Sequence, residues 1–314
     1  MNRSFGTEFD AFEDAMRGVN GRYTLVRAHQ RDWQMQFIVL GDIELMLCQN
    51  GAGGVYEGAC RAHNYGLFFP LWDINTVIVN GCGVGASSLT WLAAGKEFHV
   101  YNSDVLRWVG ITMGCATVDR WLSLNADPLP LPVSRHAVDS AGKMPLACLR
   151  DFVIRLFDVY NASPAGLLSS HACAEAREQL MWRIYDAVRS MTQASEGGTG
   201  RPRASRVEVL RRATALMEMH INEPVHLADL CRVTGVSNRT LQTIFMEHYG
   251  VSPHRYLMLR RLRAIHGALR QAMPDETVSD ICGRFGVWDF GRLSRVYRQT
   301  YGVLPSVTLR RSRG

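Results

Sequence analysis

A pattern that occurs twice in the C-terminal third limits most strongly what this chain can fold into. The run Asp229-Leu-Cys-Arg-Val-Thr-Gly-Val236 returns in altered form as Asp280-Ile-Cys-Gly-Arg-Phe-Gly-Val287, 51 positions later. The run Tyr249-Gly-Val-Ser-Pro253 returns as Tyr301-Gly-Val-Leu-Pro305, 52 positions later. The sequence therefore predicts two copies of one small unit.

The first copy is expected to be a helix, a tight turn and a second helix. Gly235 suits the left-handed turn that ends the first helix, and Ser237 suits the N-cap of the second. The second helix has an apolar stripe of Leu241, Ile244 and Phe245. Its opposite face carries the polar side chains Asn238, Arg239, Gln242 and Thr243.

The second copy repeats this layout around Gly286, and Leu293, Val296 and Tyr297 form its apolar stripe. The side chains left outside are Trp288, Asp289, Arg292 and Arg295. Such a face is typical of a helix-turn-helix that enters the major groove, where Arg contacts guanine and Gln or Asn contacts adenine. The alternative is two amphipathic helices around a glycine that bind no DNA.

The segment 253–272 between the copies has the apolar spacing of a single helix. About 20 residues of helix span roughly 30 Å, close to the roughly 34 Å between successive major-groove faces of B-DNA. One chain is therefore expected to reach two adjacent grooves. We expect Arg260, Arg261, Arg263 and Arg270 to lie mostly on the other faces of this helix, where some can contact phosphates.

Over 207–310 the sequence resembles the AraC/XylS family of bacterial transcription regulators. The resemblance is carried by the duplicated unit, the Gly-Val-Ser turn at 235–237, the Tyr-Gly-Val-Ser-Pro run at 249–253 and the run at 292–298. It implies a monomer with two reading helices, an upstream cupin-like sensing or dimerising domain, and RNA polymerase as a partner. The chain departs from the family pattern at Cys231, Cys282 and Val287, and 288–291 begins the second reading helix in an unusual way, so base contacts are not assigned to Phe290 and Gly291.

Charge is distributed unevenly along the chain, although the total is only +6. From Arg201 onward there are 19 Arg, no Lys and 9 acidic residues, a charge of +10, whereas residues 1–200 sum to −4. This places positive charge where the helix-turn-helix units lie and indicates double-stranded DNA as a partner. A membrane surface or another polyanion is the alternative.

Several function classes are not indicated. The 8 Cys follow no CxxC or zinc spacing, His29, His63 and His99 are isolated, and no nucleophile elbow or phosphate-binding glycine loop occurs. We therefore expect no metal, no cofactor and no enzyme activity. The chain has no apolar run long enough for a membrane span and no secretory signal, so a cytoplasmic location is expected.

Short strand-like runs separated by Gly, Asn and Asp fill 23–113 and predict a sandwich or small barrel. The expected strands are 23–29, 36–40, 43–48, 67–69, 76–79, 98–101 and 105–113, after an amphipathic helix within 1–20. Helical spacing returns at 145–156 and 172–191. The predicted class is α+β, with a sensing and dimerising domain at 1–192 (β-rich 20–115, helical 145–192), a linker at 193–206 and an all-α domain at 207–314.

A ligand pocket in the barrel is expected to be lined by aromatic groups and a few polar ones. The candidates are Arg27, Arg31, Trp33, Arg61, Trp72 and Trp91. The alternative is that the tryptophans are core residues. Arg27 and Arg31 would share one face of a strand, as an anion clamp similar to the Arg-x-x-x-Arg pattern of cyclic-di-GMP binders.

The sequence thus favours a DNA-binding transcription regulator that responds to a small-molecule effector. The helices within 145–192 either pair with a second copy in a homodimer, as the resemblance implies, or pack on the barrel. A regulator without a ligand, controlled by its abundance or by a protein partner, is the competing hypothesis. A cyclic-di-GMP-responsive regulator is a further alternative.

Overall fold

The computed structural model describes residues 2–6, 9–28, 31–71, 77–124, 137–140, 143–164, 169–191 and 203–313. The chain divides into two compact units, one holding most of residues 1–197 and the other holding residues 198–314 together with the short segments 24–30 and 52–55. Residues 192–202, which include most of the predicted linker 193–206, lie outside the described residues, and the remainder of that linker begins helix α6. The predicted domain limits therefore stay a prediction.

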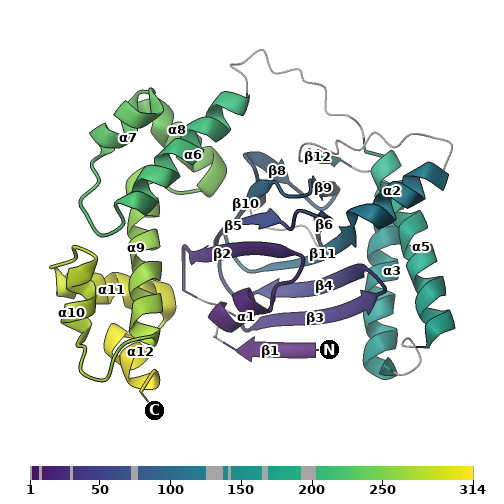
Figure 1. The fold of residues 1–314 in the computed structure, drawn as a ribbon, viewed down its shortest axis with the longest axis horizontal. Helices are drawn as coiled ribbons and strands as arrows, with labels where there is room; N and C mark the ends of the chain where they lie inside the picture. The colour runs from purple at the N-terminus through teal and green to yellow at the C-terminus, as the bar shows by residue number, and fades with distance from the viewer. Residues whose placement is uncertain are drawn as a thin grey trace. The chain divides into compact units, whose positions relative to one another are not determined.

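Two antiparallel sheets build the N-terminal unit (Figure 1). The larger sheet has the order β1 (Asn2–Gly6), β3 (Trp33–Leu40), β4 (Ile43–Asn50), β11 (Leu106–Gly114), β6 (Asn64–Pro70), β9 (Ser88–Leu92) and β12 (Ala137–Ser140). The smaller has the order β2 (Val19–Leu25), β5 (Gly54–Cys60), β10 (Glu97–Asn102), β7 (Val77–Val79) and β8 (Cys82–Val84).

Both faces of the larger sheet are covered, which explains why its central strands are buried almost continuously rather than alternately. Helices α3 (Lys143–Ala162) and α5 (Ser170–Arg189) pack against one face, where Val109, Leu149 and Leu180 are fully buried in one core. Side chains from both sheets fill the other face. Two short helices, α1 (Phe9–Ala15) and α2 (Cys115–Leu124), complete the unit.

The predicted class is confirmed, since a β-rich domain precedes helices and an all-α domain, but two local predictions were wrong. Strand β2 ends at Leu25, because Gly53 O accepts from the amides of both Val26 and Arg27, so Arg27 and Arg31 share no strand. The helix expected within 1–20 is α1, which ends at Ala15. Strand β5 was missed because its glycines suggested turns. Gly58 is needed for close packing, since an added Cβ would lie 3.0 Å from Asn20 O of β2.

The C-terminal unit is all-α and is organised around α9 (Pro253–Arg270), the predicted spacer. Helices α6 (Arg203–Met219), α7 (Leu227–Thr234) and α8 (Asn238–Tyr249) gather at one end of α9, and α10 (Val278–Arg284), α11 (Phe290–Tyr301) and α12 (Pro305–Arg311) at the other (Figure 1). Both predicted helix-turn-helix units are present. The buried stripe of α6 is Val209, Leu210, Ala213 and Met217, whereas Val207 is 48% exposed.

None of the helices in the described ranges combines the length and the apolar character needed to cross a bilayer.

Candidate nucleic-acid interface and interior cavity

The first helix-turn-helix is fixed by local backbone chemistry. Gly235 closes α7 with a φ of 70°, and its amide donates to Cys231 O. The Ser237 hydroxyl then accepts from the Thr240 amide at 3.2 Å and starts α8. The short α7–α8 connection therefore follows from two residues whose conformational preferences match their positions.

The outer face of α8 holds the four polar candidates of the first copy, all of them exposed: Asn238, Arg239, Gln242 and Thr243. The Gln242 amide Nε2 donates to Asn238 Oδ1 at 3.0 Å, and the Thr243 hydroxyl donates to Arg239 O at 3.0 Å. The amide pair leaves further donors and acceptors of both side chains pointing outward, which suits recognition of a base edge.

The second helix-turn-helix uses the same devices with different residues. Thr277 and Asp280 form a capping box at the start of α10, and Gly286 makes the turn with a φ of 65°. Asp289 is the N-cap of α11, and its Oδ1 accepts from the Arg292 amide at 2.9 Å. Asp289 therefore has a structural role that sequence reasoning missed, although Asp is a preferred N-cap residue.

The second helix-turn-helix exposes three of its candidates, as predicted: Trp288, Arg292 and Arg295. The side chain of Trp288 is 74% exposed. The Trp288 ring lies over Gly283 of α10, where an added Cβ would be 3.5 Å from the ring. In each helix-turn-helix, the four side chains predicted to read DNA are thus exposed to solvent. Their contacts with DNA remain a prediction.

Two arginines of α9 hold the unit together instead of facing outward. Arg260 is 6% exposed and forms an ion pair with Glu218 of α6. Arg261 donates to the backbone carbonyl of Ile221 at 3.0 Å and to that of Glu223. The expectation that these arginines lie on outer faces was therefore wrong for Arg260. The guanidinium groups of Arg260 and Arg261 lie where α6 and the residues that follow it pack against α9.

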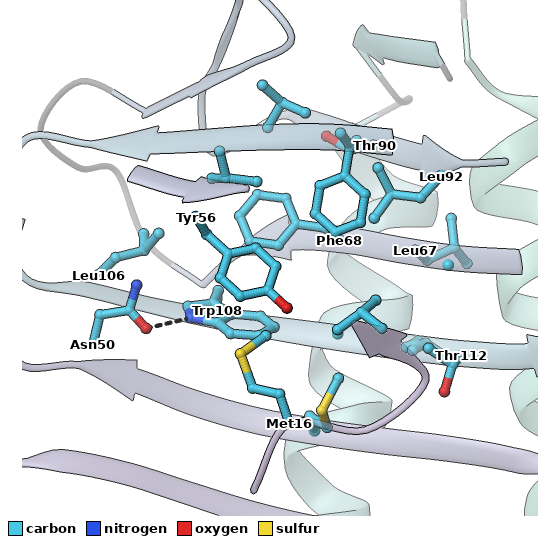
Figure 2. Close-up of a pocket in the computed structure, with 18 of the residues that line it drawn as sticks. Met16, Asn50, Tyr56, Leu67, Phe68, Thr90, Leu92, Leu106, Trp108 and Thr112 are labelled. Carbon is cyan, nitrogen blue, oxygen red and sulfur yellow. Dashed lines mark hydrogen bonds between the residues drawn. The ribbon is translucent and has the colours of Figure 1, made fainter. Parts of the chain in front are cut away.

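A cavity of about 60 Å³ lies between the two sheets of the N-terminal unit (Figure 2). Its wall includes Tyr56 of β5, Phe68 of β6, Thr90 of β9 and Trp108 of β11. No described residue that lines it carries a charge. Apolar and aromatic groups dominate the wall, as in many small-molecule sites.

Most of the polar groups at this wall bond to one another. Trp108 Nε1 donates to Asn50 Oδ1 at 3.0 Å, and Asn50 Nδ2 donates to the Tyr23 hydroxyl at 3.0 Å. The Tyr23 hydroxyl in turn donates to Asn102 Oδ1. Burial raises the pKa of the Tyr23 phenol far above its usual range, although the bonds to Asn102 and Asn50 act in the opposite direction.

The predicted ligand residues are not brought together around this cavity. Trp33 is 0% exposed and packs against Phe12 with ring centroids 4.9 Å apart, and Trp91 stacks on Tyr65 in the core beneath α3 and α5. The side chains of Arg27, Arg31 and Arg61 are exposed and do not line the cavity. Trp72 lies outside the described residues.

Among the tryptophans that the structure describes, Trp108 is the one that lines the cavity. Along β11, Leu106, Trp108, Gly110 and Thr112 line the cavity, while Val109 belongs to the core against the helices. Period-2 alternation within the predicted strand 105–113 was the signal that could have separated these faces.

Within the described part of the chain, no group of three or more His, Cys, Asp or Glu side chains is arranged to hold a metal ion. All eight cysteines are free thiols.

Comparison with known proteins gives matches to the C-terminal unit. A helix-turn-helix domain family matches residues 230–311. The probable thc operon regulatory protein of Rhodococcus erythropolis is 36% identical over 110 residues, which are 35% of this chain and 33% of that protein. XylDLEGF operon transcriptional activator 3 of Pseudomonas putida is 32% identical over 101 residues, 32% of this chain and 30% of that protein. The match thus spans about a third of the length of these curated relatives.

Among solved structures, the AraC-like transcriptional activator CuxR is similar with a TM-score of 0.43 at 13% identity, over 85% of this chain and 95% of that chain.

Proposed function

Because this chain belongs to the AraC/XylS family through its C-terminal domain, we propose that it is a sequence-specific DNA-binding transcription regulator. The observation that carries the proposal is the pair of exposed polar helix faces, on α8 and α11, whose units lie at opposite ends of one straight helix, α9. Its 18 residues correspond to about 27 Å of helix, near the spacing of adjacent major grooves.

In this function the two reading helices have different chemistry. On α8, the amides of Asn238 and Gln242 suit adenine, and Arg239 suits guanine or phosphate. On α11, Arg292 and Arg295 suit guanine, and the exposed ring of Trp288 suits an apolar contact with a thymine methyl group or a sugar. The operator would then consist of two dissimilar segments about 10 base pairs apart.

The excess of arginine supports the same proposal through electrostatics. A charge of +10 after Arg201 predicts affinity for any duplex that falls steeply with salt, because bound cations are released from the phosphates. Base contacts by the reading helices would add specificity to this general attraction.

The proposal is tested by selecting bound sequences from a random duplex library with the full chain at physiological salt. We expect two enriched segments about one helical turn apart and protection of both by footprinting. The double variant Gln242→Ala, Arg295→Ala is expected to keep salt-dependent binding but lose the enrichment. Binding without any sequence preference by the unaltered chain would contradict the proposal.

For the N-terminal unit we propose the role of an effector sensor, supported by the uncharged cavity between its sheets. A homodimer and contact with RNA polymerase are further parts of this proposal. The second candidate is a regulator without a ligand, controlled by its abundance or by a protein partner, and the small volume of the cavity favours it. A thermal-shift screen separates the two, because a bound effector raises the melting temperature.

A further inference from the structure

Trp288 is the most exposed tryptophan among the residues that the structure describes. Its side chain is 74% exposed, and the next most exposed is Trp182 of α5, at 47%. Covering an apolar ring of this size removes a large area from water, which favours the complex that covers it. The ring of Trp288 is therefore a source of binding free energy that the folded chain does not use internally.

The position of this ring is fixed by the helix-turn-helix itself. Before Trp288, the Val287 amide donates to Cys282 O at 3.1 Å, and after it Asp289 caps α11. The ring rests on α10, because a Cβ added to Gly283 would lie 3.5 Å from its Cη2 and Cζ3 atoms. The side chain is thus held in place before it meets a partner, which lowers the entropic cost of binding.

The place of Trp288 in the motif directs the ring toward base edges. In a helix-turn-helix the first helix crosses the DNA backbone, and the N-terminal residues of the second contact base edges in the major groove. Trp288 directly precedes the N-cap of that second helix, α11. Gly291, in the first turn of α11, is exposed, and an added Cβ would make only an ordinary contact of 3.7 Å with Asp289 Oδ1. Packing leaves room there for a side chain that the sequence does not supply, so the backbone can approach the bases closely.

The chemistry of the major groove then determines the partner. Its base edges present hydrogen-bond donors and acceptors, and thymine alone adds an apolar group, the C5 methyl. We propose that Trp288 is a specificity-determining residue that reads thymine in the second operator segment by covering its C5 methyl group with the indole ring. The inference rests on the proposed regulator function and selects the methyl group, rather than a sugar, as the partner of the ring.

The test uses the full chain and the operator duplex selected from the random library. Each thymine of the second segment is replaced in turn by deoxyuridine, which differs only in lacking the C5 methyl, and affinity is measured by fluorescence anisotropy. We expect a position at which losing the methyl weakens binding about fourfold, which corresponds to burial of one methyl-sized group. This ratio should not depend on salt concentration, because no phosphate contact changes.

Variants assign the methyl contact to the ring. Trp288→Ala is expected to bind the thymine and deoxyuridine duplexes with equal affinity, and Trp288→Phe, which keeps an apolar ring, should still prefer thymine. The ratio of the two affinities is the readout, because any loss of folded protein lowers both affinities equally. Trp182→Ala is the matched control: Trp182 is also exposed but belongs to α5, outside both helix-turn-helix units, and its loss should leave the ratio unchanged.

The proposal is overturned if the second segment contains no thymine whose methyl group contributes to affinity, or if Trp288→Ala keeps the ratio of the unaltered chain. An equal loss on both duplexes, with no methyl effect in the unaltered chain, would assign the ring to the sugar–phosphate backbone and also overturn it. Failure of the regulator function itself looks different, because the library selection would then yield no enriched segments. Retained enrichment without a methyl effect would reject the role of Trp288 alone.

Discussion

The ring of Tyr301 lies parallel to the imidazole of His266, with centroids 4.2 Å apart and planes 8° apart. Tyr249, which has the same place in the first copy, stacks on Tyr256 with centroids 4.4 Å apart and planes 3° apart. His266 and Tyr256 both belong to α9. In each helix-turn-helix, the tyrosine at the end of the reading helix therefore stacks on a ring of the shared helix.

Replacing Tyr301 by Ala is expected to destabilise the second helix-turn-helix selectively. The side chain is 8% exposed, and truncating a buried aromatic residue commonly costs about 3–5 kcal/mol. Hydrogen exchange followed by mass spectrometry should show faster exchange in α10 and α11 than in α7 and α8. Tyr301→Phe, which keeps the ring, is the control and should change exchange little; equal acceleration in both units would contradict a separate attachment.

The two turn glycines are expected to differ in their tolerance of alanine. Gly235 has a φ of 70° and open space around an added Cβ, so Gly235→Ala should cost about 1–2 kcal/mol of backbone strain. Gly286 has a φ of 65°, and an added Cβ would lie 2.8 Å from the backbone oxygen of Asn222. Gly286→Ala should therefore lower the free energy of unfolding, measured in urea, clearly more than Gly235→Ala does. Equal losses for the two variants would show that the backbone near Asn222 moves to make room for the added Cβ.

The C-terminal architecture could be predicted because its determinants are local. Gly235, Ser237 and Gly286 have conformational preferences that fix the turns whatever surrounds them. The roles of Asp289 and Arg260 were harder to predict from the sequence. The first depended on knowing that α11 starts at Phe290, and the second on the packing of α6 against α9.

Thiol reactivity should distinguish buried cysteines from exposed ones. Burial raises the pKa of Cys282 to about 11, from 9.0, so its thiolate fraction at about pH 8 should be about a hundredfold lower. Burial likewise raises the pKa of Cys60 to about 12, whereas Cys148 of α3 is exposed. Iodoacetamide labelling mapped by mass spectrometry should modify Cys148 first, and all eight cysteines in denaturant. Early modification of Cys282 would contradict the packing of α10.

The buried phenol of Tyr23 should make the N-terminal unit sensitive to alkali. An unfolded phenol ionises at about pH 10, whereas burial raises the native pKa of Tyr23 well above that value. The native state thus favours the neutral form. This contribution to stability is complete below about pH 10 and is lost as the pH rises toward the native pKa.

Absorbance at the phenolate band provides the measurement for Tyr23. Part of the phenolate signal should develop only when the unit unfolds, and this late fraction should be smaller in Tyr23→Phe. Tyr56 is also buried with a raised pKa and should remain in the late fraction of that variant. An early, reversible titration of all ten tyrosines would contradict this prediction.

The residues that line the cavity could not be assigned from the sequence because the two faces of the large sheet are both apolar. Trp91 and Trp108 each lie in a strand of this sheet, yet Trp91 packs beneath α3 and α5 while Trp108 lines the cavity. Which face is which depends on helices distant in sequence. The Arg27–Arg31 spacing suggested an anion clamp because it assumed a strand, and β2 ends before Arg27.

Arg295→Ala is expected to separate base recognition from phosphate contact at the second reading helix. If the exposed guanidinium bonds to guanine, affinity should fall by about 1–3 kcal/mol for the selected operator and much less for an operator changed at that one base. Fluorescence anisotropy with the two duplexes at several salt concentrations provides the measurement. Arg211→Ala is the control, because Arg211 on α6 is exposed and pairs with Glu208 of the same helix, which is not a reading helix. A uniform loss on every duplex, with the salt slope reduced by about 1, would assign Arg295 to phosphate.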